Sequence, residues 1–273
     1  MALVDVGGLH LHVQREGPRG APALLVLHGF TGAADELLVP ARELAAFERI
    51  GVDLIGHGRS DAPTDPARYA FARALDDLVT MLDRLELPRV ALWGYSQGGR
   101  LALGFALAHP ERVSQLILES ASPGIESETE RMARCRDDEA LATFIEREGI
   151  DAFVAKWEAL PLFATERKLP THIQDEIRFT RCAQRPIGLA NALRGLGTGA
   201  QPSLWPRLNE LNCPTLLITG DRDEKFHALA QKMASRISSS RHISIANAGH
   251  APHREQPSAS VASIAEFLSA RNP

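Results

Sequence analysis

The chain has 273 residues, 44% of them hydrophobic, and a formal net charge of −4 at pH 7. This length and composition fit one globular α/β domain with an insertion, and the weak acidity argues against a nucleic-acid-binding protein, which normally presents a basic face. With three cysteines in no metal-binding spacing, no signal-peptide pattern and no apolar run of membrane-spanning length, we expect a cytoplasmic protein without membrane contact.

The first half of the chain alternates between predicted strands and predicted helices. Residues that alternate around Gly7-Gly8 predict a β-hairpin over residues 3–15. Short apolar runs that end in turn residues predict buried strands. The strands expected are residues 23–29, 49–58, 89–96 and 112–122. The helices expected, each with a long apolar face or a wholly apolar sequence, are residues 74–87 and 97–109.

The pattern changes between residues 123 and 200, where helical stretches rich in Arg, Asp and Glu appear without a convincing strand. The alternation then resumes. Strands are expected at 214–220 and 241–249, and helices at 225–236 and 257–270. Alternating units predict a mostly parallel, doubly wound sheet. We therefore expect a core of residues 1–122 and 201–273, with a helical cap, residues 123–200, inserted after the fifth or sixth strand.

A candidate nucleophile lies at the junction between a predicted strand and the apolar helix that follows it. Gly94-Tyr95-Ser96-Gln97-Gly98 matches the pattern G-x-S-x-G, in which the serine occupies a strained turn and larger flanking residues would collide with the strand and helix. A helix N-cap serine in a glycine-rich turn is the alternative interpretation. The buried strand and apolar helix on either side favour the catalytic one.

A catalytic serine needs a base, and the base needs a group that orients it. In this architecture the chain order is Ser, then Asp, then His, each in a loop after a strand. The segment TGDRDEKF offers Asp221 and Asp223, and NAGHAPH offers His250 and His253. We predict Asp223 and His250 as the partners of the serine, with Asp221 in a turn. A metal site on the two histidines lacks a nearby acidic or cysteine ligand, so no metal is predicted.

The segment LHGFTG, residues 27–32, ends an early predicted strand. A loop at this place can donate one backbone N–H to an oxyanion hole, and the residue after the serine can donate the second. We assign these donors to Phe30 and Gln97. His28 and His57 are expected to hold the loops through hydrogen bonds. Neither a dinucleotide-binding glycine motif nor a phosphate-binding loop occurs, so we expect no cofactor.

Taken together, these residues resemble the α/β-hydrolase fold over the whole chain. Further segments are similar to the 2-succinyl-6-hydroxy-2,4-cyclohexadiene-1-carboxylate synthase (MenH) family of menaquinone biosynthesis. The arginine after the serine motif and the RDxKF and HREQP runs are more specific than the pentapeptide. The segments are GYSQGGR, GDRDEKFHALA, AGHAPHREQP and PGIESETERMARCR. The resemblance implies a lyase that eliminates pyruvate from a succinyl-enolpyruvyl-hydroxycyclohexene carboxylate.

The resemblance also implies residues that bind a small anionic substrate with several carboxylates. Arginine suits this role because its guanidinium group can bind a carboxylate through two parallel hydrogen bonds. The cap assignments rest on spacing, so Arg136 or Arg181 would replace Arg134 or Arg178 if a helix register were off by one turn. The residues implied are Tyr95, Arg100, Arg134, Trp157, Phe163 and Arg178.

In the implied mechanism His250, oriented by Asp223, takes the proton of Ser96, and Ser96 removes a ring proton of the substrate. Direct transfer to His250 remains open from the sequence. One alternative function is an esterase or C–C bond hydrolase on the same fold. A second is a non-catalytic receptor, against which the complete Ser, Asp and His set argues. The sequence does not indicate an oligomeric state.

Overall fold

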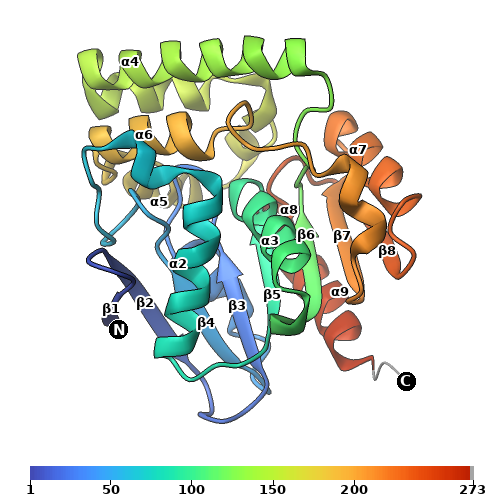
Figure 1. Cartoon of the computed structure of the whole chain (residues 1–273). Coiled ribbons are helices and arrows are strands. Elements are labelled where there is room, and N and C mark those ends of the chain that lie inside the picture. The colour runs from blue at the N-terminus through green and yellow to red at the C-terminus, as the bar shows by residue number, and fades with distance from the viewer. Residues whose placement is uncertain (271–273) are drawn as a thin grey trace.

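The computed structural model describes residues 1–270 and contains one eight-stranded sheet in the order β1-β2-β4-β3-β5-β6-β7-β8 (Figure 1). β1 and β2 form the predicted hairpin, and β2 is antiparallel to β4. All later pairs are parallel. The strands are β1 (Ala2–Asp5), β2 (His10–Glu16), β3 (Ala23–Leu27), β4 (Glu48–Val52), β5 (Val90–Tyr95), β6 (Val113–Glu119), β7 (Thr215–Gly220) and β8 (Ser240–Ile245).

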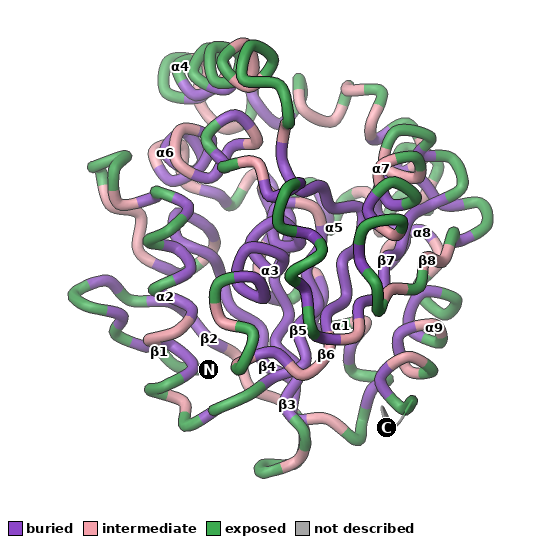
Figure 2. Tube along the Cα trace, turned by 45° about the vertical axis from the view of Figure 1, so that its right-hand side comes forward, coloured by how far each residue is buried: buried purple, intermediate pink, exposed green. Residues whose placement is uncertain are grey.

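Helices cover both faces of this sheet, which explains why central strands such as β3 and β5 are continuously apolar. Leu25 of β3 belongs to the apolar cluster beneath α2 (Phe71–Arg84), α3 (Gln97–Ala108) and α7 (Glu224–Ala234). Its neighbour Leu24 belongs to the cluster on the other face, beneath α1 (Asp35–Ala41) and α9 (Pro257–Ser269). In Figure 2 the central strands, β3 to β7, are almost wholly buried between these layers.

The segment between β6 and β7 is helical and lies over one end of the sheet in Figure 1. We refer to residues 123–200 as the cap. Its long helix α4 is interrupted at Gly149, where φ is 81°, and its outer side is exposed in Figure 2. Side chains of α4 and α6 form a small apolar cluster of their own. The cap helices are α4 (Glu128–Glu158), α5 (Thr171–Cys182) and α6 (Pro186–Leu196).

The remaining helical elements are short. α8 (Pro252–Glu255) follows the last strand closely. The 3-10 helices are η1 (Pro66–Tyr69), η2 (Pro110–Arg112), η3 (Pro161–Phe163), η4 (Glu166–Lys168) and η5 (Trp205–Glu210). Throughout residues 1–270, no helix has the length and apolar character that crossing a membrane requires.

The predicted α/β-hydrolase fold with its mostly parallel sheet is confirmed, and the helical insertion follows the sixth strand. Most of the predicted strands end earlier than expected, and the difference is largest for those over 49–58, 112–122 and 241–249, because the chain leaves the sheet in loops. These loops lie at the carboxyl end of the sheet and carry several of the polar residues described below. Helices α1 and α8 were not predicted from the sequence.

Candidate active site

Ser96 lies between the end of β5 and the start of α3 in a sharp turn. Its backbone angles are φ 50° and ψ −107°, a conformation that residues with side chains rarely adopt. The turn is crowded: a Cβ atom on Gly98 would collide with the Leu27 carbonyl oxygen, and one on Gly94 with the Gly98 carbonyl oxygen. Glycine at both positions lets strand and helix approach, and the serine side chain is left free of the backbone.

Loops after β7 and β8 bring two partners to this serine. The His250 Nε2 atom lies 3.1 Å from Ser96 Oγ, and His250 Nδ1 lies 2.7 Å from Asp223 Oδ2. Asp223 also accepts the Phe226 N–H at the start of α7, which fixes its carboxylate. Both Asp223 and His250 are buried. With Nδ1–H donating to the carboxylate, Nε2 is free to accept the serine proton.

Asp221 and His253, the alternatives to Asp223 and His250 in the sequence, form no hydrogen bond with Ser96 in the described part of the chain. Asp221 is exposed at the end of β7. His253 is buried, and its Nδ1 atom lies 2.8 Å from Glu119 Oε1, which also accepts the His253 backbone N–H. Among the described residues, no group of three or more His, Cys, Asp or Glu side chains is arranged to hold a metal ion.

The two expected oxyanion donors flank the serine from different elements. Gln97 is the first residue of α3, and Phe30 lies in the loop after β3. Over residues 1–270, neither backbone N–H is used in a hydrogen bond. His28 accepts the Leu54 N–H through Nε2 at 2.9 Å, and His57 Nδ1 contacts the Ile55 carbonyl at 3.0 Å. Burial lowers the pKa of His57 to about 3, so it stays neutral and supports the loop.

A cavity of about 710 Å³ lies at the serine. Its aromatic wall comes mostly from the cap and the loop after β3, with ring centroids 5.3 Å apart for Phe30 and Trp157 and 5.6 Å apart for Trp157 and Phe163. Of the residues predicted to form the site, those that line it are Phe30, Tyr95, Ser96, Gln97, Arg100, Arg134, Trp157, Phe163 and His250. Asp223 lies behind His250.

Arg178 does not line this cavity. Its side chain is 47% exposed and pairs with Glu158 at 2.5 Å. Arg181, which follows within the same helix, is buried and does line the cavity. Of the two arginines that the spacing left open in this helix, the one that faces the cavity is thus Arg181, and Arg178 faces away from it.

The arginines of the cavity differ in their partners. Arg134 pairs with Asp138 at 2.7 Å, and Arg181 pairs with Glu166 at 2.8 Å and with Glu158 at 3.4 Å. Arg100 instead donates from Nη1 to the Leu196 carbonyl at 2.8 Å and to Gln201 Oε1 at 2.9 Å.

Arg100 has no carboxylate within ion-pair distance in the part of the chain that the structure describes. It is also more buried than its position four residues after the serine suggested, with 7% of its surface exposed. Burial, followed by the charge of Arg134, lowers the pKa of Arg100 to about 10, at which the side chain is still a cation near neutral pH. This cation faces the cavity without a counter-charge of its own.

Several lining residues were not predicted. Arg254 reaches the cavity from α8, and Lys225 and Phe226 reach it from the first turn of α7. The ring of Phe226 lies 4.5 Å from that of His250, centroid to centroid. The HREQP and RDxKF runs held the signal for these residues, because both runs stand directly beside the predicted partners of the serine.

The parallel sheet, the turn at Ser96 and the hydrogen-bonded Ser, His and Asp side chains define the class of α/β-hydrolases, and residues 22–257 match the model of the alpha/beta hydrolase fold family. More narrowly, the chain belongs to the 2-succinyl-6-hydroxy-2,4-cyclohexadiene-1-carboxylate synthase family, as its sequence resemblance predicted.

Two relatives support this placement, and a third, an esterase, shares the fold. A protein of Bacillus subtilis (strain 168) named putative 2-succinyl-6-hydroxy-2,4-cyclohexadiene-1-carboxylate synthase is 45% identical over 96% of this chain and 95% of its own length. The structure of MenH from S. aureus is 37% identical, covers 94% of this chain and 97% of that one, and has a TM-score of 0.90. A thermophilic esterase from Thermogutta terrifontis is 29% identical, covers 97% and 96%, and has a TM-score of 0.84.

Proposed function

We propose that this chain eliminates pyruvate from 2-succinyl-5-enolpyruvyl-6-hydroxy-3-cyclohexene-1-carboxylate to give 2-succinyl-6-hydroxy-2,4-cyclohexadiene-1-carboxylate. One observation carries the proposal: the buried guanidinium of Arg100 shares a cavity with Ser96 and His250 and lacks a carboxylate partner among the described residues. A substrate carboxylate would supply that partner. The names of the Bacillus subtilis and S. aureus relatives support the same reaction.

The substrate of this reaction has three carboxylates, and three arginines in the cavity suit it. We assign Arg100, Arg134 and Arg181 to them, with the aromatic side chains of Trp157 and Phe163 against the ring. The contacts of Arg134 and Arg181 with protein carboxylates leave donors unused, because a guanidinium has five N–H groups. Tyr95 completes the site beneath them.

In the proposed mechanism His250 takes the proton of Ser96 Oγ, and Ser96 removes a proton from the substrate ring. The electrons of the broken C–H bond form a new ring double bond, the ring double bond already present shifts by one position toward the carbon that carries the enolpyruvyl group, and the C–O bond of that carbon breaks with its electron pair on oxygen. The enolate that leaves takes up a proton at carbon and becomes pyruvate. The N–H groups of Phe30 and Gln97 stabilise negative charge that develops on the substrate, and one such donor is typically worth about 3 kcal/mol of barrier.

We further propose that the cap, residues 123–200, forms a separate unit over a core of residues 1–122 and 201–273, and that it excludes water from the reacting atoms. Side chains and backbone groups carry every step, so the mechanism requires neither a metal ion nor a cofactor. The cysteines of the described chain are unpaired thiols, which supports a reducing, cytoplasmic location.

Substitution of Arg100 tests the observation on which this proposal rests. We expect Arg100→Ala to lower kcat/KM for the tricarboxylate by about one to two orders of magnitude, since a charge-assisted buried contact is worth roughly 1.5–3 kcal/mol. Arg100→Lys should recover part of the loss. Hydrolysis of a neutral aryl ester should change little. An equal fall of both activities together with the melting temperature would mean that Arg100 only braces α3 against Leu196 and Gln201.

A serine esterase is the second candidate, because the Thermogutta terrifontis esterase shares the fold at 29% identity. The arrangement of Ser96, His250 and Asp223 is equally suited to acyl transfer. The cavity favours the lyase, since a neutral ester has no carboxylate that could bind the buried guanidinium of Arg100. The two candidates differ in the product released: pyruvate from the lyase, and an acid with an alcohol or phenol from the esterase.

A further inference from the structure

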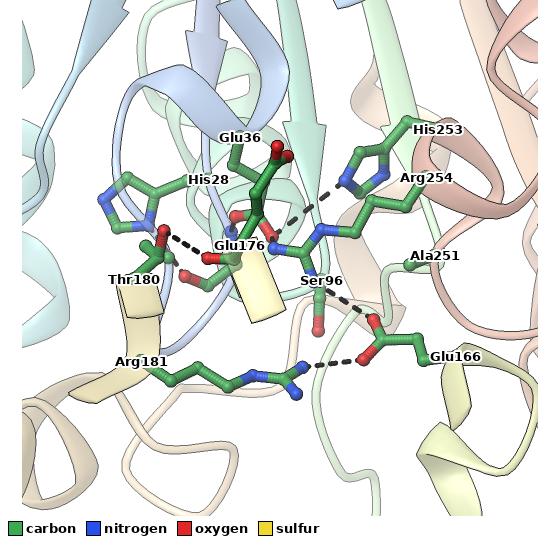
Figure 3. A network of polar contacts seen from close by, with 12 residues as sticks. His28, Glu36, Ser96, Glu166, Glu176, Thr180, Arg181, Ala251, His253 and Arg254 are labelled. Carbon is green, nitrogen blue, oxygen red and sulfur yellow. Dashed lines mark hydrogen bonds and ion pairs between the residues drawn. The ribbon is translucent and has the colours of Figure 1, made fainter. Parts of the chain in front are cut away.

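A chain of buried charges runs past the active-site serine from the core into the cap (Figure 3). Arg254 of α8 lies at its centre, between two carboxylates. Its Nη2 atom contacts Glu36 Oε1 at the start of α1, and its Nη1 atom donates to Glu166 Oε1 in the cap at 3.0 Å. Glu166 in turn pairs with Arg181. The side chains of Arg254, Glu36 and Glu166 are 15%, 3% and 5% exposed.

At its core end, this series of buried charges contacts the backbone of the loop after β3. The second oxygen of Glu36 accepts the Gly29 N–H at 2.7 Å. The loop closes tightly around that carboxylate, with the Gly32 N–H bonded to the Gly29 carbonyl at 3.0 Å and Thr31 at a φ of 71°. A Cβ atom on Gly32 would collide with Glu36 Oε2. The carboxylate of Glu36 thus fixes the conformation of the loop that carries the Phe30 N–H.

The ionisation of Glu36 and of Glu166 depends on the charge of Arg254. Burial alone would raise the pKa of Glu36. The positive charge of Arg254, with smaller contributions from His253, His28 and the Gly29 N–H, outweighs burial and holds the pKa below its ordinary value. Burial opposes ionisation of Glu166 in the same way, and Arg254 and Arg181 together lower its pKa. Without the guanidinium of Arg254, Glu36 would be a buried carboxylate without its strongest partner, which is costly enough to move or protonate it.

We propose that Arg254 is a positioning residue, which fixes the loop of residues 29–32 through Glu36 and thereby holds the Phe30 N–H toward the reacting atoms. Although Arg254 lines the cavity, both of its terminal nitrogens bind protein carboxylates. This distinguishes it from Arg100, whose guanidinium has none. The inference rests on the proposed function, in which the Phe30 N–H stabilises developing negative charge.

Glu166, the second carboxylate that Arg254 binds, connects the loop to the cap. Two further contacts bridge the same parts of the molecule: Gln184 Nε2 donates to the Gly32 carbonyl at 3.0 Å, and the Phe30 ring packs against Trp157. Through its contacts with Arg254, Gly32 and Phe30, the cap therefore helps to fix the position of the Phe30 N–H. The positioning role of Arg254 should accordingly appear in the chemical step rather than in substrate affinity.

Two variants separate this role from others. Arg254→Met removes the guanidinium, and Glu36→Met removes the acceptor of the Gly29 N–H while leaving Arg254 its contact with Glu166. Each should lower kcat for pyruvate release by about 10- to 100-fold, as expected for a misplaced donor, and should change KM by less than about threefold. The double variant should be little worse than the poorer single one, because both act on one loop. Arg254→Lys should restore part of kcat.

The matched control is Arg68→Met. Arg68 pairs with Asp77 through two hydrogen bonds of 2.6 and 2.8 Å and lies outside the cavity lining. The Arg68→Met substitution should lower the melting temperature without lowering kcat. Amide hydrogen exchange gives a readout that does not depend on activity: the peptide over residues 28–33 should exchange faster in Arg254→Met and Glu36→Met, and at the wild-type rate in Arg68→Met.

A raised KM with unchanged kcat in Arg254→Met would overturn the proposal in favour of direct substrate binding. Unchanged kcat with only a lower melting temperature, or unchanged exchange in residues 28–33, would reduce Arg254 to a structural ion pair. Wild-type protein is assayed alongside. If it releases no pyruvate, the proposed function is wrong, while the exchange experiment still decides whether Arg254 holds the loop.

Discussion

At the scale of single residues, the strained backbone of Ser96 determines what the site can do. A positive φ at a residue with a side chain costs free energy and persists only where the surroundings enforce it. Here β5, α3 and the glycines at 94 and 98 enforce it. The result is a hydroxyl 3.1 Å from His250 Nε2, at the N-terminus of a helix, where negative charge is favoured.

Ser96, Asp223 and His250 are expected to act as a unit, because they form one hydrogen-bonded series. Ser96→Ala, Asp223→Asn and His250→Ala should each lower kcat by orders of magnitude, and double variants should lose little more than the worst single one. Steady-state kinetics of the purified variants checks this. Near-normal turnover in Asp223→Asn would contradict the assignment and move the orienting role to another carboxylate, with Asp221 the next to test.

Another prediction compares two arginines of α5 that differ in where they point. Arg181→Ala should lower kcat/KM for the tricarboxylate by about tenfold or more, because the removed cation faces the cavity. Arg178→Ala should stay within about twofold of wild type, since an exposed ion pair with Glu158 contributes little. The reverse ranking would restore the original assignment of Arg178 and contradict the position of α5.

At the scale of elements, the close approach of β3, β5 and α3 depends on Gly98. Gly98→Ala should lower the free energy of unfolding and abolish most activity, because the added methyl group collides with the backbone of Leu27 rather than with a movable side chain. Ala108→Gly, near the exposed end of the same helix, is the control and should cost at most about 1 kcal/mol without a change in kcat. Wild-type kcat in Gly98→Ala would argue against the crowded turn.

The buried carboxylates of the charge chain predict a pH dependence of stability. The pKa of Glu166 is lower in the folded protein than its ordinary value of 4.5, so its ionised form favours folding. That contribution is complete above about pH 4.5 and is lost as the pH falls through the lower, folded-state pKa. Urea unfolding of wild type and Glu166→Gln between pH 7 and 3 measures it. The stabilities should converge in acid, and a constant difference would contradict the prediction.

The elements differ in how far the sequence predicts them. Strands such as β3 were predictable because a parallel strand covered on both faces is a continuous apolar run. Helix α1 was not, because it has seven residues and contains Pro40. The registers of cap helices were the weakest part, since spacing alone does not say whether Arg178 or Arg181 points inward. That choice is made by the packing of α5 against the rest of the cap.

At the scale of the whole molecule, the sheet topology assembles the site. Ser96 and His250 are 154 residues apart in the chain, yet the loops after β5, β7 and β8 open at the same edge of one sheet. The sequence could predict Ser96, Asp223 and His250 because their places follow from strand ends and chain order. It could not predict the role of Arg254, which depends on Glu36 and Glu166 from distant segments meeting in space.

The lyase activity is tested most directly by the product that the purified protein releases. Incubation with the succinyl-enolpyruvyl substrate should yield one pyruvate per substrate consumed, at a rate that EDTA does not alter, and this reaction should be much faster than hydrolysis of a short-chain aryl ester. Pyruvate is measured by a coupled dehydrogenase and ester cleavage by the released phenol. Fast ester turnover without pyruvate release would contradict the lyase assignment and leave the esterase in its place.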